Sequence, residues 1–296
     1  MHKFLGAVGF GEYTSTRKVQ ELVKDVIMNA DRRNYTSNGG KDEGILVEFC
    51  KDFAENAGIA VCGEFDAEDN FIFYYFYPYL IGTGISSMED ISIERHAATE
   101  SYAGVCDDVK VGVTLIFYLQ NMIDYVKLRN ADRFPLRGTS LTLAALSSQG
   151  SIMMPIIKSE KQKKRIRKSS ITRNQLIEAA RKGDEDAIES LTLEDMDTYT
   201  AISRRIQNED VFSLVDTYFM PYGVECDQYS VLGEITECRK IQNRRSGEYI
   251  WIISVDCNEL NFDICINEKD LFGEPEKGRR FKGVVWMQGT VNYPDR

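Results

Sequence analysis

"EYIWIISVDC" (residues 248–257) decides how the end of this chain folds. It is rich in β-branched and aromatic residues, and similar stretches surround it: "YSVLGEITEC" (229–238), "LNFDICIN" (260–267) and "RFKGVVWMQGTV" (280–291). Such segments, with glycines at the bends, predict consecutive β-strands. Four or five short strands can close a small barrel of the oligonucleotide-binding (OB) type or a similar sandwich. We therefore expect residues 224–296 to form a small OB-like β-barrel.

The segment before the barrel has a helical pattern. "NQLIEAARKGDEDAIESL" (174–191) predicts two helices with a turn near Gly183, and the apolar residues that follow it share one side of a helix. Thr172 and Gln175 have the spacing of a capping box, which predicts that the first helix starts there. We assign residues 158–223 to a basic linker followed by this helical segment.

Residues 1–157 predict a helix packed on a mostly antiparallel sheet. Apolar residues recur at helical spacing in "TRKVQELVKDVIMNADRR" (16–33), and the stretches that follow are short, β-branched and separated by turn residues. "SSQG" (147–150) predicts a hairpin turn between two of these strands. The whole chain is therefore expected to be an α+β protein with an N-terminal sheet domain (1–157), a helical middle (158–223) and a barrel (224–296).

The strand "FIFYYFYPY" (71–79) is aromatic along its whole length. Strict alternation would place Phe71, Phe73, Tyr75, Tyr77 and Tyr79 on one side of the sheet. A strand that is apolar on both faces is typical of the buried centre of a sheet. Because tyrosine keeps a polar hydroxyl, a ligand pocket or a partner interface on this strand is the alternative.

Composition limits the possible functions. The 296 residues are 43% hydrophobic and 28% charged with a net charge of −10, which is typical of a globular protein. No apolar stretch is long enough to cross a bilayer, and the N-terminus lacks the pattern of a signal peptide. We therefore expect a protein without a membrane contact, located in the cytoplasm.

Cysteines and histidines argue against a metal centre. The seven cysteines include no C-x-x-C pair, so free thiols in a reducing compartment are expected rather than disulfides or a zinc site. Only His2 and His96 could supply imidazole ligands. The phosphate-binding and calcium-loop signatures also fail on spacing. We predict neither a metal nor a cofactor.

A dense basic run, "KSEKQKKRIRKSS" (158–170), stands out in this acidic chain. It contains seven Lys or Arg residues, which could neutralise phosphates of a nucleic acid. However, the run lacks the aromatic residues that stack on bases, and residues 158–223 are neutral as a whole. We favour a solvated linker over a polyanion contact.

The expected barrel supplies the candidate binding residues. "RKIQNRR" places Arg239, Lys240, Arg244 and Arg245 between the first two strands, where an OB-fold has a ligand-facing loop. Tyr249 and Trp251 share one face of the next strand and could stack on bases. The alternative is that Trp251 lies in the core with the aliphatic residues of that face, while the arginines decorate a turn. We favour that alternative.

One loop gathers the residue types of an acid–base site. "ERHAATESYAGVCDD" (94–108) contains Glu94, His96, Glu100 and Asp107, and a histidine near carboxylates is a reasonable general base. Cys106 could be a nucleophile if His96 lowered its pKa. Loops between strands also collect such residues without any function, so these residues are candidates for catalysis and no more.

Three stretches carry a resemblance to a known family. Residues 187–235, together with "MHKFLGAVGF" (1–10) and residues 94–108, resemble an uncharacterised bacterial family that is known only as a domain of unknown function. The resemblance covers nearly the whole chain, and it implies no activity, cofactor or catalytic residue.

From the residues we predict a non-catalytic binding or regulatory protein. It would act through the barrel or the aromatic strand on a protein or nucleic-acid partner. The alternative is an enzyme of unknown class with acid–base chemistry around His96.

Overall fold

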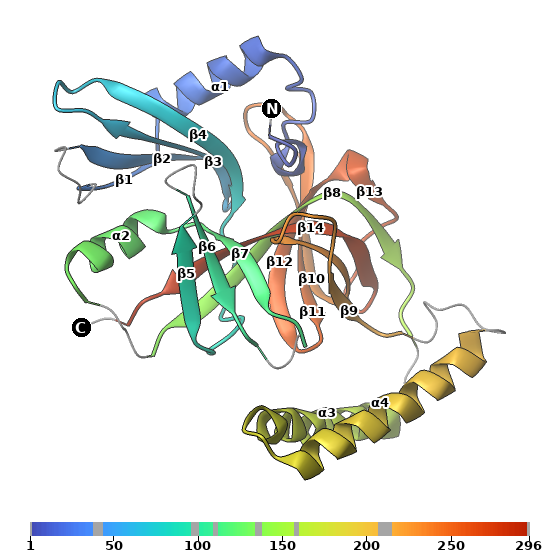
Figure 1. Cartoon of the computed structure of the whole chain (residues 1–296). Coiled ribbons are helices and arrows are strands. Elements are labelled where there is room, and N and C mark those ends of the chain that lie inside the picture. Colours follow the sequence, from blue (N-terminus) through green and yellow to red (C-terminus); the bar gives the residue numbers. More distant parts are fainter. Residues whose placement is uncertain are drawn as a thin grey trace.

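Two sheets and a helical hairpin make up the protein (Figure 1). The computed structural model describes residues 2–37, 44–95, 101–108, 112–133, 138–156, 160–206 and 215–294. The predicted α+β class, with mostly antiparallel strands and packed helices, is confirmed. No helix in these ranges combines the length and the apolar composition that crossing a bilayer requires.

The first sheet is an antiparallel meander. Its strands, in spatial order, are β1 (Arg32–Ser37), β2 (Ile45–Ala54), β3 (Ala57–Phe65) and β4 (Phe71–Leu80). Helix α1 (Thr16–Met28) packs on β2 and β3 through a buried stripe of Val19, Leu22 and Val26. The predicted helix and strands of this region are confirmed, with β1 as an additional polar edge strand.

The second sheet closes into a five-stranded barrel. Its strands are β8 (Ser140–Met153), β12 (Leu260–Asn267), β11 (Tyr249–Cys257), β10 (Gln228–Gln242) and β14 (Arg280–Asn292), and β14 pairs with β8 again. The predicted small C-terminal barrel is thus confirmed, but it takes one strand from residues 140–153. The three-part division of the chain stays a prediction.

The strand pairing is that of an OB barrel with its order permuted along the chain. β10, β11 and β12 form an antiparallel meander, and β12 pairs in parallel with β8. β8 and β10 both pair antiparallel with β14. An OB barrel has the same meander and the same parallel pair, but the parallel partner is its last strand. Here that strand comes first.

Smaller elements extend the barrel sheet. Beyond β14 lie β7 (Leu115–Leu119), β6 (Tyr102–Cys106) and β5 (Ile91–Arg95). Helix α2 (Met122–Asn130) follows β7 in the chain and contacts β1 and β2 of the first sheet. β9 (Tyr218–Pro221) pairs with β10, and β13 (Leu271–Phe272) pairs with β8. Short 3-10 helices, η1 (Gly6–Val8) and η2 (Glu268–Asp270), complete the body.

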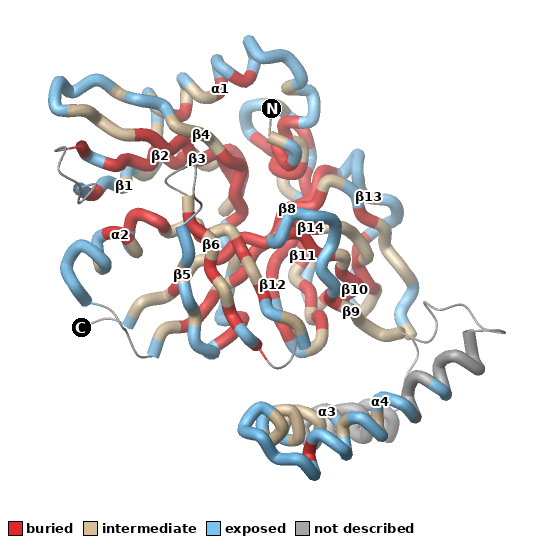
Figure 2. Tube along the Cα trace, in the orientation of Figure 1, coloured by how far each residue is buried: buried red, intermediate tan, exposed pale blue. Residues whose placement is uncertain are grey.

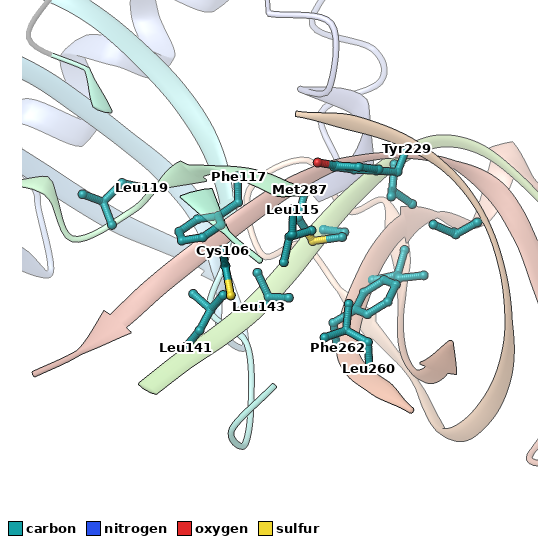
Figure 3. Packing of buried hydrophobic residues seen from close by; sticks show 14 of the residues in the cluster. Cys106, Leu115, Phe117, Leu119, Leu141, Leu143, Tyr229, Leu260, Phe262 and Met287 are labelled. Atoms are coloured by element: carbon teal, nitrogen blue, oxygen red, sulfur yellow. The ribbon is translucent and has the colours of Figure 1, made fainter. Parts of the chain in front are cut away.

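Buried residues run along the first sheet and the barrel strands (Figure 2), and they form two hydrophobic cores that meet at the barrel wall. One core fills the barrel and continues under β5–β7, with residues such as Phe117, Leu143 and Phe262 (Figure 3). The other lies between the outer side of the barrel and the first sheet, and it includes Phe4 and Phe10 from the N-terminal segment. The barrel strands therefore bury apolar residues on both faces.

A hairpin of two helices departs from the rest of the fold (Figure 1). α3 (Glu160–Arg181) and α4 (Glu185–Ile206) are joined by a turn at Gly183, which has a φ of 89°. The predicted turn is confirmed, but the predicted helix start at Thr172 is wrong. The basic run up to Ser170 is helical from Glu160, because Lys, Arg, Gln and Glu are good helix formers and no Gly or Pro interrupts them.

The predicted hairpin turn at residues 147–150 is also wrong. β8 runs without a break from Ser140 to Met153, with a register shift opposite Val284 and Val285. At this register shift β8 has one residue more than β14. The extra residue forms a bulge and not a turn, because β8 pairs with β14 on both sides of it. A Cβ on Gly150 would lie 2.5 Å from the Phe281 ring, so glycine at this position leaves room for the ring.

We predict that β8 is as essential to the barrel as its C-terminal strands. Leu143→Ala removes a fully buried side chain from the barrel core and should lower the free energy of unfolding by about 2–5 kcal/mol. Met154→Ala, at an exposed position just beyond β8, should change it by less than about 0.5 kcal/mol. Urea unfolding of the full chain measures both values, and equal small effects would contradict the assignment.

Candidate functional site

Helix α1 forms one wall of a surface groove. Ser15 caps the helix, because its Oγ accepts a hydrogen bond from the backbone N–H of Lys18 at 3.3 Å. The buried stripe anchors α1 on the first sheet, and the flank of the helix beside that stripe faces β4. This flank contributes Thr16, Val19, Gln20, Val23 and Lys24 to the groove.

A β-bulge in β4 forms the other wall. The register between β3 and β4 shifts at Gly63, where Tyr74 is the extra residue. A shift by one residue exchanges the faces of the strand, so Phe73 and Phe76 both line the groove beside α1. A Cβ on Gly63 would lie 2.4 Å from the carbonyl oxygen of Ile72, which explains the glycine.

The bulge corrects one expectation from the sequence. The predicted single side with Phe71, Phe73, Tyr75, Tyr77 and Tyr79 is wrong, because alternation is interrupted at Tyr74. The rings of Tyr77 and Tyr118 are 4.6 Å apart, so Tyr77 faces the barrel sheet, whereas the Tyr79 hydroxyl contacts Arg32 and Asp52 of the first sheet. One strand thereby presents phenylalanines to the groove and tyrosines to the interior.

The groove is apolar at its base and polar at its rim. It has a volume of about 520 Å³, which lies within the range of sites for small apolar groups. Val19, Val23, Phe73 and Phe76 supply the apolar surface, whereas hydroxyl, amide and ammonium groups come from Thr14, Thr16, Gln20 and Lys24. Phe73 is 48% exposed, which is unusual for an aromatic residue on a strand of a packed sheet.

On the other side of β4, a polar cluster lies between the two sheets. Glu48 of β2 accepts hydrogen bonds from the hydroxyl of Tyr77 at 2.7 Å and from Nδ2 of Asn34 at 3.2 Å. The hydroxyl of Tyr118 donates to that of Tyr75 at 3.4 Å. These bonds satisfy polar groups that the packing of the two sheets has removed from water.

Burial favours the neutral forms of the groups in this cluster. It raises the pKa of Glu48 above the ordinary value of 4.5, against the opposing effect of the Tyr77 hydrogen bond. It also raises the pKa of the Tyr77 and Tyr118 hydroxyls well above 10. Groups whose neutral forms are favoured by burial suit the interface between two packed sheets.

Three of the predicted binding arginines contact the protein itself. Arg245 Nη1 lies 2.5 Å from Asp25 of α1, and Arg244 Nη2 donates to the carbonyl oxygen of Asp52 at 2.9 Å. Arg239 lies 3.7 Å from the Glu55 carboxylate. The β10–β11 loop and the adjoining end of β10 therefore attach the barrel to α1 and the first sheet.

The other predicted binding residues lie together near one end of the barrel. Lys240 Nζ is 4.7 Å from the ring centroid of Tyr249 and 5.9 Å from that of Trp251, and it pairs with Glu268. Tyr249 is 45% exposed. Trp251 packs against the barrel core, as the favoured interpretation expected. The lysine therefore contacts a carboxylate and two rings of the protein itself.

The N-terminal segment covers the face of the barrel that would bind ligands in an OB-fold. That face belongs to the second and third strands of the meander, here β11 and β12. Asn243 Nδ2 donates to the carbonyl oxygen of Val8 at 2.8 Å, and Glu248 accepts from the backbone N–H groups of Gly11 and Glu12, both at 3.1 Å. This face is internal to the fold.

The predicted acid–base residues are only partly within the described residues. His96 and Glu100 lie outside them. Glu94 is exposed on β5 opposite Ala103, four residues along the sheet from Asp107, which corresponds to about 13 Å. Asp107 accepts a hydrogen bond from Thr114 Oγ1 at 2.6 Å. The structure does not bring these two carboxylates together.

The buried thiols are poor nucleophiles. All seven cysteines are free, and burial raises the pKa of Cys106 to about 11 and that of Cys257 to about 12. Since a thiolate is the reactive form, these residues behave as small apolar side chains. No group of three or more His, Cys, Asp or Glu side chains within the described ranges could hold a metal ion.

Sequence reasoning missed most of the groove. Val19 and Val23 were predicted only as parts of the apolar helix face, and nothing in the sequence marks Gln20 or Lys24 as neighbours of Phe73. The one available signal was the aromatic composition of β4, but which of its side chains face α1 depends on the bulge. A bulge is decided by the pairing of two strands and leaves no reliable pattern in one of them.

We predict an unusual pH dependence from Glu48. Because burial raises its pKa in the folded protein, the protonated form is favoured by folding. Its stabilising effect is full below the unfolded pKa near 4.5 and is lost as the pH rises through the folded pKa. Wild type should therefore gain stability relative to Glu48→Gln as the pH falls from about 8 to about 5.

Urea unfolding of both proteins across this range measures the difference. Glu68→Gln, at an exposed position, serves as the control and should give a curve parallel to wild type. Parallel curves for wild type and Glu48→Gln would contradict the prediction.

We also predict that Asn243 holds the N-terminal segment in place. Asn243 is fully buried, and its Oδ1 accepts from the N–H of Arg245 at 2.9 Å while its Nδ2 binds Val8. Asn243→Ala should lower the free energy of unfolding by about 1–3 kcal/mol, because buried backbone groups lose their partners. Asn130→Ala breaks an exposed hydrogen bond to Ser37 and should cost less than about 0.5 kcal/mol. Calorimetry or urea unfolding distinguishes the two variants.

Comparison with known proteins identifies a family. The family model described as "Domain of unknown function, E. rectale Gene description (DUF3881)" matches residues 5–289. No curated protein and no solved structure matches the chain.

Proposed function

The chain belongs to the DUF3881 family of domains of unknown function, and from this premise we propose that it is a non-catalytic binding protein whose α1–β4 groove takes an apolar segment of a partner protein. The observation that carries the proposal is the exposure of Phe73 beside an open apolar groove. Apolar surface gains free energy when a partner covers it, and aromatic side chains are common at the centre of such contacts.

The shape of the groove suits one or two large side chains. Its apolar base would take an aliphatic or aromatic residue, and Gln20, Lys24 and the two threonines could bond to the partner's backbone. This arrangement corresponds to an apolar anchor within a polar rim.

A protein partner is favoured over a nucleic acid. Arg239, Arg244 and Arg245 are engaged with the first sheet and α1, and Lys240 is paired with Glu268. The chain has a net charge of −10, which disfavours approach to a polyanion. The proposal also places the protein in the cytoplasm, because its seven thiols are free and a reducing compartment would keep them so.

The experiment compares two matched substitutions in the protein's host. Phe73→Asp puts a charge in the groove, whereas Phe272→Asp puts the same charge on β13 at a residue that is 82% exposed. A photoreactive amino acid replaces Gln20 in each background and in wild type. We expect one cross-linked protein with wild type and with Phe272→Asp, reduced at least roughly tenfold by Phe73→Asp.

Direct binding then tests the assignment. A peptide from the cross-linked segment should bind purified wild type and Phe272→Asp with equal affinity and should bind Phe73→Asp weakly. Cross-links that survive Phe73→Asp, or that disappear after nuclease treatment, would refute the groove as a protein-binding site.

A further inference from the structure

Helix α1 covers the centre of the first sheet and leaves β4 open beside it. The helix packs on β2 and β3, and the pairing register places Val47, Gly63 and Phe73 in one row across β2, β3 and β4. Val61 and Phe76 are neighbours in the next row of the same face. Val47 and Val61 are buried, whereas Phe73 is 48% exposed and Phe76 is half-buried. The cover provided by α1 therefore ends between β3 and β4.

The open face of β4 has the dimensions of a site for a second helix. Neighbouring strands lie about 4.8 Å apart, so a helix centred over β2 and β3 has its axis roughly 7 Å to the side of β4. Packed helices keep their axes about 8–10 Å apart, which places a second helix over β4 or just beyond it. Phe73 and Phe76 lie three residues apart, about 10 Å along a strand, which is close to two turns of a helix.

An added strand is disfavoured, because the edge of β4 is blocked. β4 is the outermost strand of the first sheet. Pro78 has no N–H, and its carbonyl oxygen accepts from Gln288 Nε2 at 2.8 Å. The N–H of Leu80 donates to Gln288 Oε1 at 3.2 Å, and the carbonyl oxygen of Leu80 accepts from Gln120 Nε2 at 2.8 Å. The bulge at Tyr74 interrupts the alternation that a further strand needs for pairing.

The rim of the groove presents one positive charge. Lys24 lines the groove and is exposed. The acidic neighbours of this lysine on α1 have other partners, since Glu21 pairs with Arg17 and Asp25 pairs with Lys51. Among the residues that the structure describes, no carboxylate forms an ion pair with Lys24. A partner that carries an acidic residue beside its apolar side chains complements this rim.

From these observations we propose that the α1–β4 groove binds an acidic amphipathic helix of a partner protein, packed beside α1 and over β4. Two apolar residues of that helix, seven positions apart, contact Phe73 and Phe76, and a residue at i+3 or i+4 between them contacts Val23. An Asp or Glu at the edge of this apolar side pairs with Lys24. The polar rim then bonds to side chains of the partner and to the free backbone groups at an end of its helix. The inference rests on the proposed function of the same groove and adds the conformation and charge of the bound segment.

Selection from a peptide library tests the conformation. Phage-displayed random peptides of about 16 residues, enough for four helical turns, are selected on the purified full chain and depleted on Phe73→Asp. We expect the selected sequences to carry apolar residues at i, i+3 or i+4, and i+7, together with Asp or Glu. Circular dichroism of a mixture of peptide and protein should show more helix than the sum of the two separate spectra.

Charge exchange tests the role of Lys24. Lys24→Glu should weaken the binding of a selected acidic peptide about fivefold or more, and the loss should shrink as salt is added. Replacement of the acidic peptide residue by Lys should restore binding to Lys24→Glu. Lys277→Glu, at an exposed position outside the groove, is the matched control and should bind the acidic peptide as wild type does. Thermal unfolding of each variant verifies that the fold is retained.

The outcomes separate this inference from the proposed function. Selected peptides whose apolar residues strictly alternate, or that bind without a gain of helix, would refute the helix and leave the groove as a binding site. Equal binding of the acidic peptide by Lys24→Glu and Lys277→Glu would refute the acidic character of the partner. If no peptide distinguishes wild type from Phe73→Asp, both the inference and the proposed function are wrong.

Discussion

Burial on both faces of the barrel wall is the constraint on which the rest of this structure depends. Along β11, Ile253 and Val255 point into the barrel, while Ile250 and Ile252 belong to the second core outside it. An apolar outer face cannot be left in water, so the N-terminal segment and the first sheet have to cover it. The first sheet and the N-terminal segment therefore pack against the barrel through the second core.

This constraint also explains where the polar residues act. Because the outer face of β11 and β12 is internal, the loop between β10 and β11 serves to hold the first sheet and the N-terminal segment. Asn243, Arg244 and Arg245 do so through hydrogen bonds and an ion pair. Glu48 and its tyrosines do the same between the sheets, where burial favours their neutral forms. These polar residues thus hold the barrel, the first sheet and the N-terminal segment together.

What remains for partners lies at the periphery. The α1–β4 groove exists because a bulge brings two phenylalanines to the side of α1, and the hairpin exists because two helices are inserted between β8 and the barrel meander. Neither feature is needed to close the barrel. Both leave apolar surface exposed, and apolar surface without a structural task is a common property of binding sites.

The sequence by itself determined the elements that have a strong local pattern. These include α1, the strands β2, β3, β11 and β12, the turn at Gly183 and the small barrel, because periodicity and turn residues act over a few neighbours. Only the tertiary structure decided the full length of β8 and its pairing with β14, the bulge at Tyr74 and the internal role of the arginines. β1 and β6 escaped prediction because a polar edge strand and a five-residue strand carry little pattern. Each of these depends on which distant surfaces meet, and that is decided by the total burial of the chain rather than by any one segment.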